Sequence, residues 1–177
     1  MTSGNAHRNG PARIMPARIV KAARSWLGTP YHDQASVKGA GCDCLGLIRG
    51  VWREVVGPEP MPVPPYSRDW GEAGPHEVLA EAARVAMVEL PIDEARTGDL
   101  VLFRMRQGAI AKHAGILTPD DRRARSHRSG RFHRSTRSYH FIHAYERTGV
   151  IEQELTDPWR RRIAFAFRFP VPDNHTT

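Results

Sequence analysis

The stretch that decides the fold is Gly39–Val56, "GAGCDCLGLIRGVWREVV". After Cys44 its apolar residues recur at helical spacing, and a Gly-Pro pair then ends the pattern. Asp43 is a suitable N-cap, so a helix is predicted over residues 44–56 with Cys44 in its first turn. Unpaired backbone N–H groups and the positive end of the helix dipole favour a thiolate there. The stretch therefore predicts a cysteine nucleophile with backbone N–H groups beside it to bind an oxyanion.

Two further helices are predicted in the first half of the chain. One begins near Pro16 and ends at "GTP", Gly28–Pro30. The other follows Pro75, which suits a first helical position. Its predicted apolar side consists of Val78, Leu79, Ala82 and Val85. The proline-rich residues 58–75 before it are expected to form an extended connection over the surface.

After Leu90 the pattern changes to short apolar or alternating runs, which predict strands. Five are expected, in "DLVLFRM", "AKHAGILT", "SYHFIHAYE", "GVIEQEL" and "RIAFAFRF". The last run places four residues on one face, as in a sheet packed on one side: Ile163, Phe165, Phe167 and Phe169. Helices followed by antiparallel strands indicate an α+β fold, with the helices on one face of a roughly five-stranded antiparallel sheet.

The length of 177 residues predicts one domain, placed at residues 16–170. Residues 1–15 and 171–177 are expected to be tails, and residues 118–140 a basic loop insertion. Seven arginines between residues 122 and 140 equal the formal net charge of +7, so the rest of the chain is neutral. A solvated insertion and an anion-binding arm both remain open for this loop. Its few aromatic residues argue against nucleic acid as the partner.

The chain contains two cysteines, Cys42 and Cys44, and their spacing is a poor geometry for a disulfide, so free thiols are expected. Cys42 is interpreted as a small buried residue beside the site. No signal peptide and no membrane span are expected. The N-terminal residues lack a continuous apolar core, and no later run approaches the ~20 apolar residues that a spanning helix needs.

A cysteine nucleophile needs a base, and the base needs an orienting partner. Among nine histidines, His113 and His143 are embedded in apolar strands, where an imidazole needs a buried partner or an open cleft. A purely structural histidine stays open for either position. Gly46 is expected to leave room in the first helical turn for a substrate backbone. Whether Trp70 and Trp159 line a cleft is left open.

Five segments together resemble a known family: "WLGTPYH", "GCDCLGLIRGVW", "RTGDLVLF", "KHAGIL" and "FIHAYE". They occur in the order and approximate spacing of the NlpC-type cell-wall cysteine peptidases, a papain-like clan that hydrolyses peptidoglycan stem peptides. The resemblance covers about Arg18–Phe169 and implies the papain-like NlpC-type fold. It implies that Cys44 is the nucleophile, His113 the general base and His143 the residue that orients the base.

The same resemblance assigns supporting residues. Tyr31 matches a tyrosine whose hydroxyl assists near the nucleophile, and Asp43 matches the aspartate that precedes it. One departure is Leu45, where the family usually has serine. It is expected to change packing or subsite contacts and to leave the nucleophile intact, because its backbone N–H is unaffected. No cofactor and no metal are expected.

The sequence of residues 32–54 is most similar to the phage-type branch of the family. Members of that branch are encoded with the tail genes of phages and gene transfer agents. This implies a protein made in the cytoplasm without a signal peptide, assembled with tail or baseplate proteins, that acts on the wall of a recipient cell. The family's usual bond joins D-glutamate to diaminopimelate.

Two alternatives to a tail-borne peptidase remain open. The first is a non-catalytic component of the tail tip that binds the wall or envelope. The second is a zinc site made by Cys42, Cys44, His113 and His143. Its Cys-x-Cys spacing is tighter than the usual gap in zinc sites.

Overall fold

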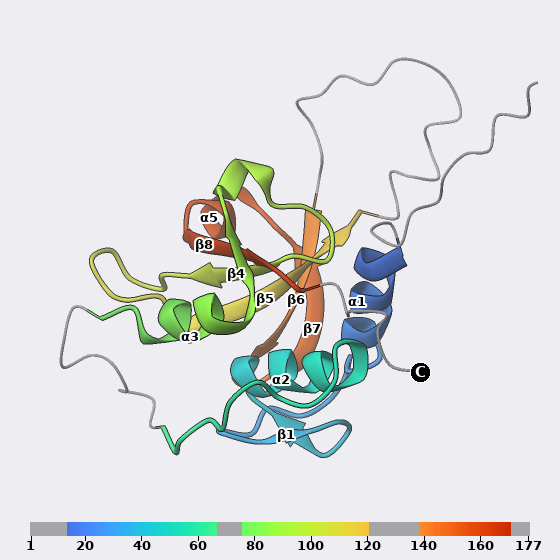
Figure 1. Cartoon of the computed structure of the whole chain (residues 1–177). Coiled ribbons are helices and arrows are strands. Elements are labelled where there is room, and N and C mark those ends of the chain that lie inside the picture. Colours follow the sequence, from blue (N-terminus) through green and yellow to red (C-terminus); the bar gives the residue numbers. More distant parts are fainter. Residues whose placement is uncertain (1–13, 67–75, 121–138, 171–177) are drawn as a thin grey trace, which may run out of the picture.

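Helices and an antiparallel sheet form the protein in a computed structural model that describes residues 14–66, 76–120 and 139–170 (Figure 1). The elements of the first part are α1 (Ile14–Arg24), β1 (Ser36–Val37), β2 (Gly41–Cys42), α2 (Cys44–Val55) and α3 (Val78–Ala86). They are followed by β3 (Val88–Leu90), the 3-10 helix η2 (Ile92–Glu94), β4 (Leu100–Phe103), β5 (His113–Pro119), β6 (Tyr139–Tyr145), β7 (Gly149–Glu154), α5 (Asp157–Arg160) and β8 (Ile163–Arg168). The α+β class is confirmed.

The main sheet has the strand order β3-β8-β4-β5-β6-β7, and each neighbouring pair is antiparallel. The five predicted strands correspond to β4 through β8. The sixth strand, β3, was not predicted. With three residues it is too short to show an alternating pattern, and its pairing with β8 defines it.

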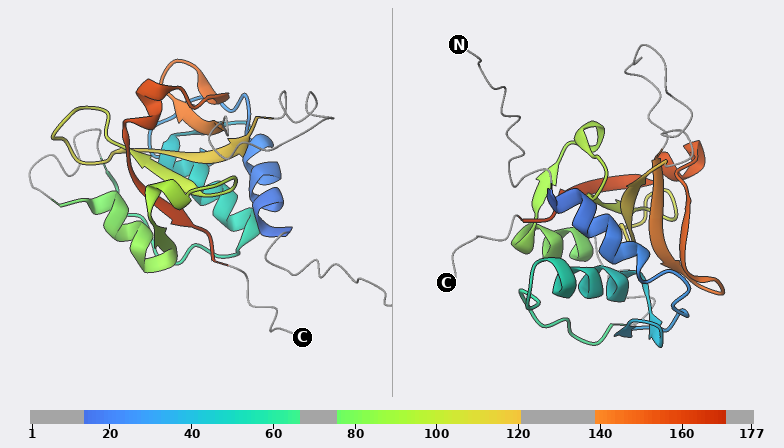
Figure 2. Two further views of the ribbon diagram at one scale, coloured as in Figure 1. Left: turned by 90° about the horizontal axis from the view of Figure 1, so that it is seen from above. Right: turned by 90° about the vertical axis from the view of Figure 1, so that its right-hand side faces the viewer.

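One apolar core lies between the helices and the sheet. Its buried members come from α1, α2 and α3, from β2 and β4 through β8, and from segments next to them, and they include Trp26, Leu47, Val51, Ala80 and Phe167. Figure 2 shows these helices together against the sheet. This layer carries α2 across β5 and β6, the strands that contain His113 and His143. The packing of α2 therefore decides where Cys44 lies relative to the histidines.

A second apolar cluster covers the opposite face of the sheet, so the prediction of a sheet packed on one side is wrong. Its buried members are Val101, Phe103, Leu117, Phe141, Leu155 and Ala166. Ile163 packs against this cluster, whereas Phe165 packs against the helices. The register of β4 and β8 shifts between Leu102 and Phe103, and this irregularity breaks the predicted alternation.

Helix α3 begins at Val78 and differs from its prediction in the face that it buries. Leu79 is buried, while Val85 is 74% exposed. Ala83 and Ala86 pack against the core, so the buried row follows Leu79 at helical spacing and lies to one side of the predicted stripe. Alanine and valine occur all around this helix, so apolar spacing alone did not distinguish its two sides. Pro75 lies outside the described residues.

The predicted proline-rich connection is described as far as residue 66. Residues 57–66, called the strap below, contain no helix or strand, in agreement with the prediction. The strap leaves the C-terminal end of α2 and runs back along that helix (Figure 1). Trp52 Nε1 donates a hydrogen bond of 2.9 Å to the Pro58 carbonyl oxygen, and Glu59 accepts bonds from Arg49 and Arg53.

The predicted basic insertion lies mostly outside the described residues. Strand β5 extends to Pro119 and β6 begins at Tyr139, so both strands include ends of the segment 118–140.

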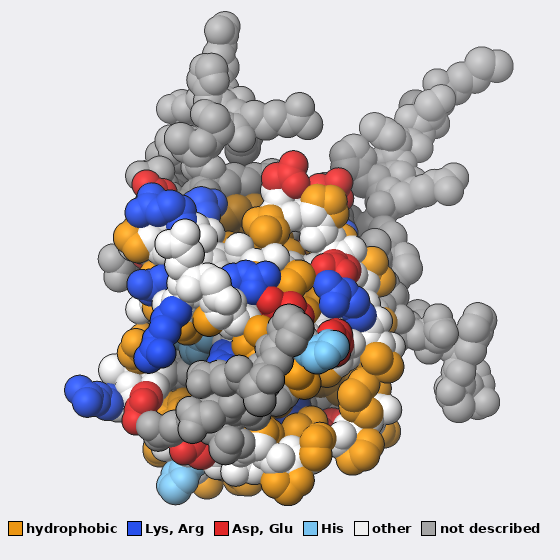
Figure 3. All heavy atoms as spheres, turned by 90° about the vertical axis from the view of Figure 1, so that its left-hand side faces the viewer, with side chains coloured by type: hydrophobic (Ala, Val, Ile, Leu, Met, Phe, Trp, Pro, Cys, Tyr) orange, Lys and Arg blue, Asp and Glu red, His pale blue; other side chains and the backbone are white. Residues whose placement is uncertain are grey.

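Figure 3 shows the face that carries α3 and the strap, where basic and acidic side chains are interspersed above a hydrophobic area. Within the described ranges, no helix combines the length and apolar character needed to cross a membrane.

Gly46 lets another segment pack against the first turn of α2. A Cβ atom at this position would lie 1.8 Å from the Ala35 carbonyl oxygen and 2.9 Å from the carbonyl carbon. The Ser36 hydroxyl also donates a 2.6 Å hydrogen bond to the Gly46 carbonyl oxygen. The expectation that Gly46 leaves room for a substrate backbone is therefore wrong, because the protein's own backbone occupies that space.

We expect Gly46→Ala to lower the free energy of unfolding by about 3 kcal/mol, since a backbone oxygen cannot rotate away from the added methyl group. The matched control is Gly108→Ala. Its Cβ would meet nothing within 4 Å, but its φ of +75° is unfavourable for alanine, so a loss of only about 1 kcal/mol is expected. Urea unfolding of both variants measures the difference. Equal losses would show that the contact with Ala35 is unimportant.

Candidate active site

Cys44 lies at the start of α2, as predicted. Asp43 is the N-cap residue, with an extended backbone, and its Oδ1 accepts a 2.6 Å hydrogen bond from the Gly46 N–H. The Asp43 side chain is buried. This bond satisfies one of the amides that a helix start leaves unpaired, and it fixes the direction in which the first turn, with Cys44, begins.

The Cys44 sulfur contacts the backbone on both sides of His113, the first residue of β5. Sγ is 3.8 Å from the carbonyl oxygen of Lys112. The backbone N–H groups of Ala114, Leu45 and Cys44 itself also interact with the sulfur, and each lowers the pKa of the thiol. The first turn of α2 and the first residues of β5 are therefore in contact through this atom.

The pKa of the Cys44 thiol differs from the sequence-based expectation. Burial, and after it the Asp43 carboxylate, raise this pKa to about 12. The amides act in the expected direction but are outweighed, because burial disfavours a charged sulfur. The helix start alone therefore does not produce a thiolate, and the site needs a base that removes the proton.

His113 and His143 form a buried pair on neighbouring strands. His113 Nε2 and His143 Nδ1 are 2.7 Å apart, and the two rings meet edge to face. Burial, and then His143, lower the pKa of His113 to about 3, and burial lowers the pKa of His143 to about 4. Both imidazoles are therefore neutral at pH 7, and one of the facing nitrogens donates its hydrogen to the other.

Aromatic side chains surround the histidine pair. Trp159 lies 5.9 Å from His113 and 5.4 Å from His143 between ring centroids, so it packs against the pair. Tyr145 contacts both rings and is 43% exposed. Tyr145 was not predicted as a site residue, although strand alternation could have placed it on the same face as His143. Trp70 lies outside the described residues.

Tyr31 lies near the sulfur, as the family resemblance implied. Its hydroxyl donates a 3.0 Å hydrogen bond to Asp33 Oδ1, and its backbone pairs with Cys42 in a short parallel bridge. Burial and Asp33 raise the pKa of Tyr31, and the nearby Cys44 and Asp43 raise it further. The hydroxyl is therefore protonated at neutral pH, and its hydrogen is donated to Asp33.

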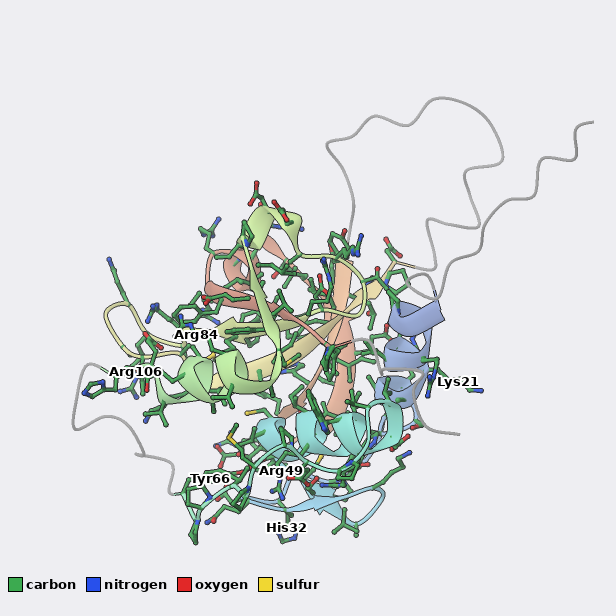
Figure 4. The ribbon with its side chains drawn as sticks, in the orientation of Figure 1. Lys21, His32, Arg49, Tyr66, Arg84 and Arg106 are labelled. Carbon is green, nitrogen blue, oxygen red and sulfur yellow. The ribbon has the colours of Figure 1, made fainter. Side chains whose placement is uncertain are left out.

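Two residues that contact Asp43 were not predicted. The Gln34 N–H donates a 2.8 Å hydrogen bond to Asp43 Oδ2, and the Tyr66 hydroxyl donates to the same oxygen. Figure 4 shows Tyr66 in the strap at the end of α2 where Cys44 lies, with Arg49 nearby. Gln34 and Tyr66 follow no periodic pattern, and the proline-rich sequence around Tyr66 indicates only an extended segment. No local signal could have found this contact.

Cys42 is fully buried in the main core, and burial raises its pKa to about 12. Both cysteines are free thiols. Within residues 14–66, 76–120 and 139–170, no group of three or more His, Cys, Asp or Glu side chains is placed to hold a metal ion. The proposed zinc site of Cys42, Cys44, His113 and His143 therefore does not form.

Leu45 directs its backbone and its side chain to different places. The backbone N–H interacts with the sulfur, whereas the side chain lines a cavity of about 100 Å³. That cavity is apolar and lies between α2, the strap and α3, with Ile48, Met61 and Leu79 among its lining residues. This arrangement agrees with the expectation that the departure from serine changes packing and leaves the nucleophile intact.

Known proteins similar to this chain include two that are named as endopeptidases. The chain is 28% identical over 153 residues to the murein DD-endopeptidase MepS/murein LD-carboxypeptidase of Escherichia coli, covering 86% of this chain and 62% of that protein. It is 22% identical over 143 residues to a probable endopeptidase of Haemophilus influenzae, covering 81% and 67% of the two chains. The chain thus spans less than two thirds of the length of the E. coli relative.

Solved structures support the fold. A protein of the NlpC/P60 family from Bacillus cereus superposes with a TM-score of 0.57 at 21% identity, covering 89% of this chain and 40% of that one. A Staphylococcus aureus protein described as similar to lipoprotein, NLP/P60 family, gives 0.53 at 20% identity, covering 98% and 46%. The family described as NlpC/P60 matches residues 28–168, which include α2, both histidines and every strand of the main sheet. The chain therefore belongs to the NlpC/P60 family.

Proposed function

We propose that this chain is a cysteine peptidase that hydrolyses peptidoglycan stem peptides. Cys44 is the nucleophile, His113 the general base and His143 the residue that orients the base. The observation that carries the proposal is the contact of the Cys44 sulfur with the backbone on both sides of His113, whose ring is hydrogen-bonded to His143 at 2.7 Å. Family membership and the names of the relatives support the reaction class.

The proposed role of His113 as general base requires one particular tautomer of each histidine. His113 Nε2 faces His143 Nδ1, so Nδ1 is the nitrogen of His113 left to take a proton. His113 then carries its hydrogen on Nε2 and donates it to His143. His143 in turn carries its own hydrogen on Nε2, which is buried among aromatic rings. In this state His143 holds the base in the productive tautomer and orientation.

The reaction begins with both partners neutral. His113 takes the thiol proton as the sulfur attacks the carbonyl carbon of the scissile amide, and negative charge moves to the carbonyl oxygen. Backbone N–H groups of Cys44 and Leu45 lie beside the sulfur and stabilise that charge. His113 returns its proton to the leaving amine, which leaves a thioester. Water, deprotonated by the same imidazole, then releases the acid and restores the thiol.

The relatives support a substrate class. The name of the E. coli relative describes a murein DD-endopeptidase and an LD-carboxypeptidase. We propose murein stem peptides as the substrate here and, from the family resemblance, the bond between D-glutamate and diaminopimelate as the one cleaved. Cleavage at a D,D cross-link is the rival outcome, and muropeptide masses distinguish the two.

We further propose that the enzyme is carried on a phage-like tail or gene transfer agent particle, bound to tail or baseplate proteins, and reaches the wall of a recipient cell from outside. The support is the resemblance of residues 32–54 to the phage-type branch. A non-catalytic component that binds the wall is the alternative, and the hydrolysis assay below separates it from the peptidase.

We expect Cys44→Ala to lower hydrolysis of purified peptidoglycan by about 10³-fold or more, because the covalent step is lost. His143→Ala should cost about 10²-fold, since His113 keeps its place but loses its orienting partner. Cys42→Ala is the matched control and should retain activity, because its sulfur is buried in the core. Mass spectrometry of released muropeptides is the measurement. Equal hydrolysis by wild type and Cys44→Ala would exclude the peptidase.

The histidine pair predicts a stability loss in mild acid. Both folded pKa values, about 3 and about 4, lie below the ordinary value of 6.5, so the unfolded chain binds more protons in this range. The stabilisation is complete above about pH 6.5 and declines as the pH falls towards the folded values. We expect the free energy of unfolding to fall by about 1–2 kcal/mol per pH unit between about pH 6 and 4.

The comparison protein for this experiment is the double variant His113→Asn/His143→Asn. It retains the carboxylates, which also contribute to acid unfolding, but lacks both imidazoles. Urea unfolding at about pH 7, 5.5 and 4.5 should therefore give a clearly flatter dependence for the variant than for wild type. Parallel curves would contradict the neutral, buried state of the pair.

The particle proposal has its own measurement. Particles purified from a culture that produces them should contain this chain, detected by mass spectrometry after density-gradient separation. The chain should co-sediment with tail proteins and should be lost from tailless particles. Its recovery only outside the particle fractions would overturn the proposal and leave the peptidase assignment untouched.

A further inference from the structure

The strap is fastened to α2 at both ends of the helix. Near the C-terminal end, the Glu59 carboxylate accepts hydrogen bonds of 2.7 and 3.3 Å from Arg49, and Arg53 pairs with the same carboxylate. At the other end, Tyr66 reaches the N-cap residue Asp43. The strap therefore places Tyr66 beside the helix start that carries Cys44, although Tyr66 and Asp43 are 23 residues apart in sequence.

Tyr66 belongs to a closed set of hydrogen bonds. Its hydroxyl donates to Asp43 Oδ2, and its backbone N–H donates to Gln34 Oε1 at 3.2 Å. Gln34 completes the set by donating its own N–H to Asp43 Oδ2 at 2.8 Å. Gln34 has a φ of +61°, a left-handed conformation that is uncommon for this residue type. These bonds hold both the backbone and the hydroxyl of Tyr66, the hydroxyl at the buried carboxylate beside the nucleophile.

Asp43 has two effects on its neighbour that oppose each other. As the N-cap it fixes the first turn of α2 and so the position of the Cys44 sulfur. As a buried anion it also repels a thiolate and raises the pKa of Cys44. Tyr31 and Tyr66 also interact electrostatically with Cys44, and Arg49 acts on Tyr66. A donor that holds the Asp43 carboxylate and spreads its charge strengthens the first effect and weakens the second.

We propose that Tyr66 is a positioning residue for Cys44, which it serves by holding the Asp43 carboxylate in its capping position and partly neutralising its charge. Two of the Asp43 donors, Gly46 and Gln34, are backbone amides that any sequence would supply. The Tyr66 hydroxyl is a side-chain donor, so it can be removed without changing the backbone. Burial and Asp43 raise the pKa of Tyr66, and the hydroxyl therefore stays protonated as a donor.

Tyr66→Phe removes the hydroxyl and keeps the ring. The bond that is lost goes to a charged acceptor, so we expect the rate of Cys44 alkylation by iodoacetamide at about pH 8 to fall about threefold to tenfold. The pH profile of alkylation should shift upward accordingly. Tyr139→Phe is the matched control, since that tyrosine packs against the second core cluster on the other face of the sheet. Mass spectrometry should confirm that Cys44, and not the buried Cys42, carries the label.

A double-mutant cycle with Asp43→Asn tests the route of the effect. The amide keeps an oxygen for the cap but carries no charge, so Tyr66→Phe should no longer slow alkylation when it is combined with Asp43→Asn. An equal slowing in both backgrounds would show that Tyr66 acts on Cys44 by some other path. A Tyr66→Phe profile identical to those of wild type and Tyr139→Phe would overturn the inference.

The inference rests on the proposed function in one respect. If the chain is a peptidase, Tyr66→Phe should lower kcat/KM for stem-peptide hydrolysis as it lowers the rate of Cys44 alkylation. The alkylation assay needs no peptidoglycan, so the two failures are distinguishable. A wild-type protein that hydrolyses no stem peptide but shows the shift with Tyr66→Phe would refute the peptidase and retain the positioning role. If Tyr66→Phe also unfolds more easily, the sign of the change still decides, because transient unfolding would expose Cys44 and speed its alkylation, whereas the inference expects slowing.

Discussion

Asp43 places its carboxylate over the first turn of α2, where it accepts hydrogen bonds from Gly46, Gln34 and Tyr66 while only 4% of the residue is exposed. Each of these donors comes from a different part of the chain. A buried carboxylate must be fully hydrogen-bonded to be tolerated, so the three segments are drawn to the same point. Cys44 is the next residue, so the hydrogen bonds that hold Asp43 also fix the position of the Cys44 sulfur.

The chemistry of the sulfur reflects a balance between burial and hydrogen bonding. Amides of the helix start and of β5 favour the thiolate, but burial and the neighbouring carboxylate favour the thiol more strongly. The buried histidines are likewise neutral. The thiol and the imidazoles are thus uncharged beside the Asp43 carboxylate, and in the proposed reaction the charge that develops meets amides that are already in place.

Packing of the helices on the sheet brings these partners together. α2 crosses β5 and β6. The backbone of Ala35 can pass close to the first turn of α2 because residue 46 is a glycine. The second cluster on the opposite face supports the histidine rings, since Phe103, Phe141 and Trp159 pack against them. Rings held between a sheet and aromatic neighbours keep a fixed direction, which the proposed proton transfer requires.

The sequence by itself determined the parts of this protein that depend on local patterns. Apolar spacing after Asp43 located α2 to within one residue at its end, and five alternating runs located β4 through β8. His113 and His143 could be selected from nine histidines because they interrupt apolar strands. Residue type and spacing carry this information, since caps, periodicity and strand alternation are properties of neighbours along the chain.

Only the tertiary structure decided the features that depend on distant contacts. Tyr66 reaches Asp43 across 23 residues, β3 is a strand because β8 pairs with it, and Val85 is exposed because α3 packs on its Leu79 side. The direction of the Cys44 pKa also belongs here. A helix start predicts a lowered value, but the depth of burial, which no local pattern encodes, reverses it.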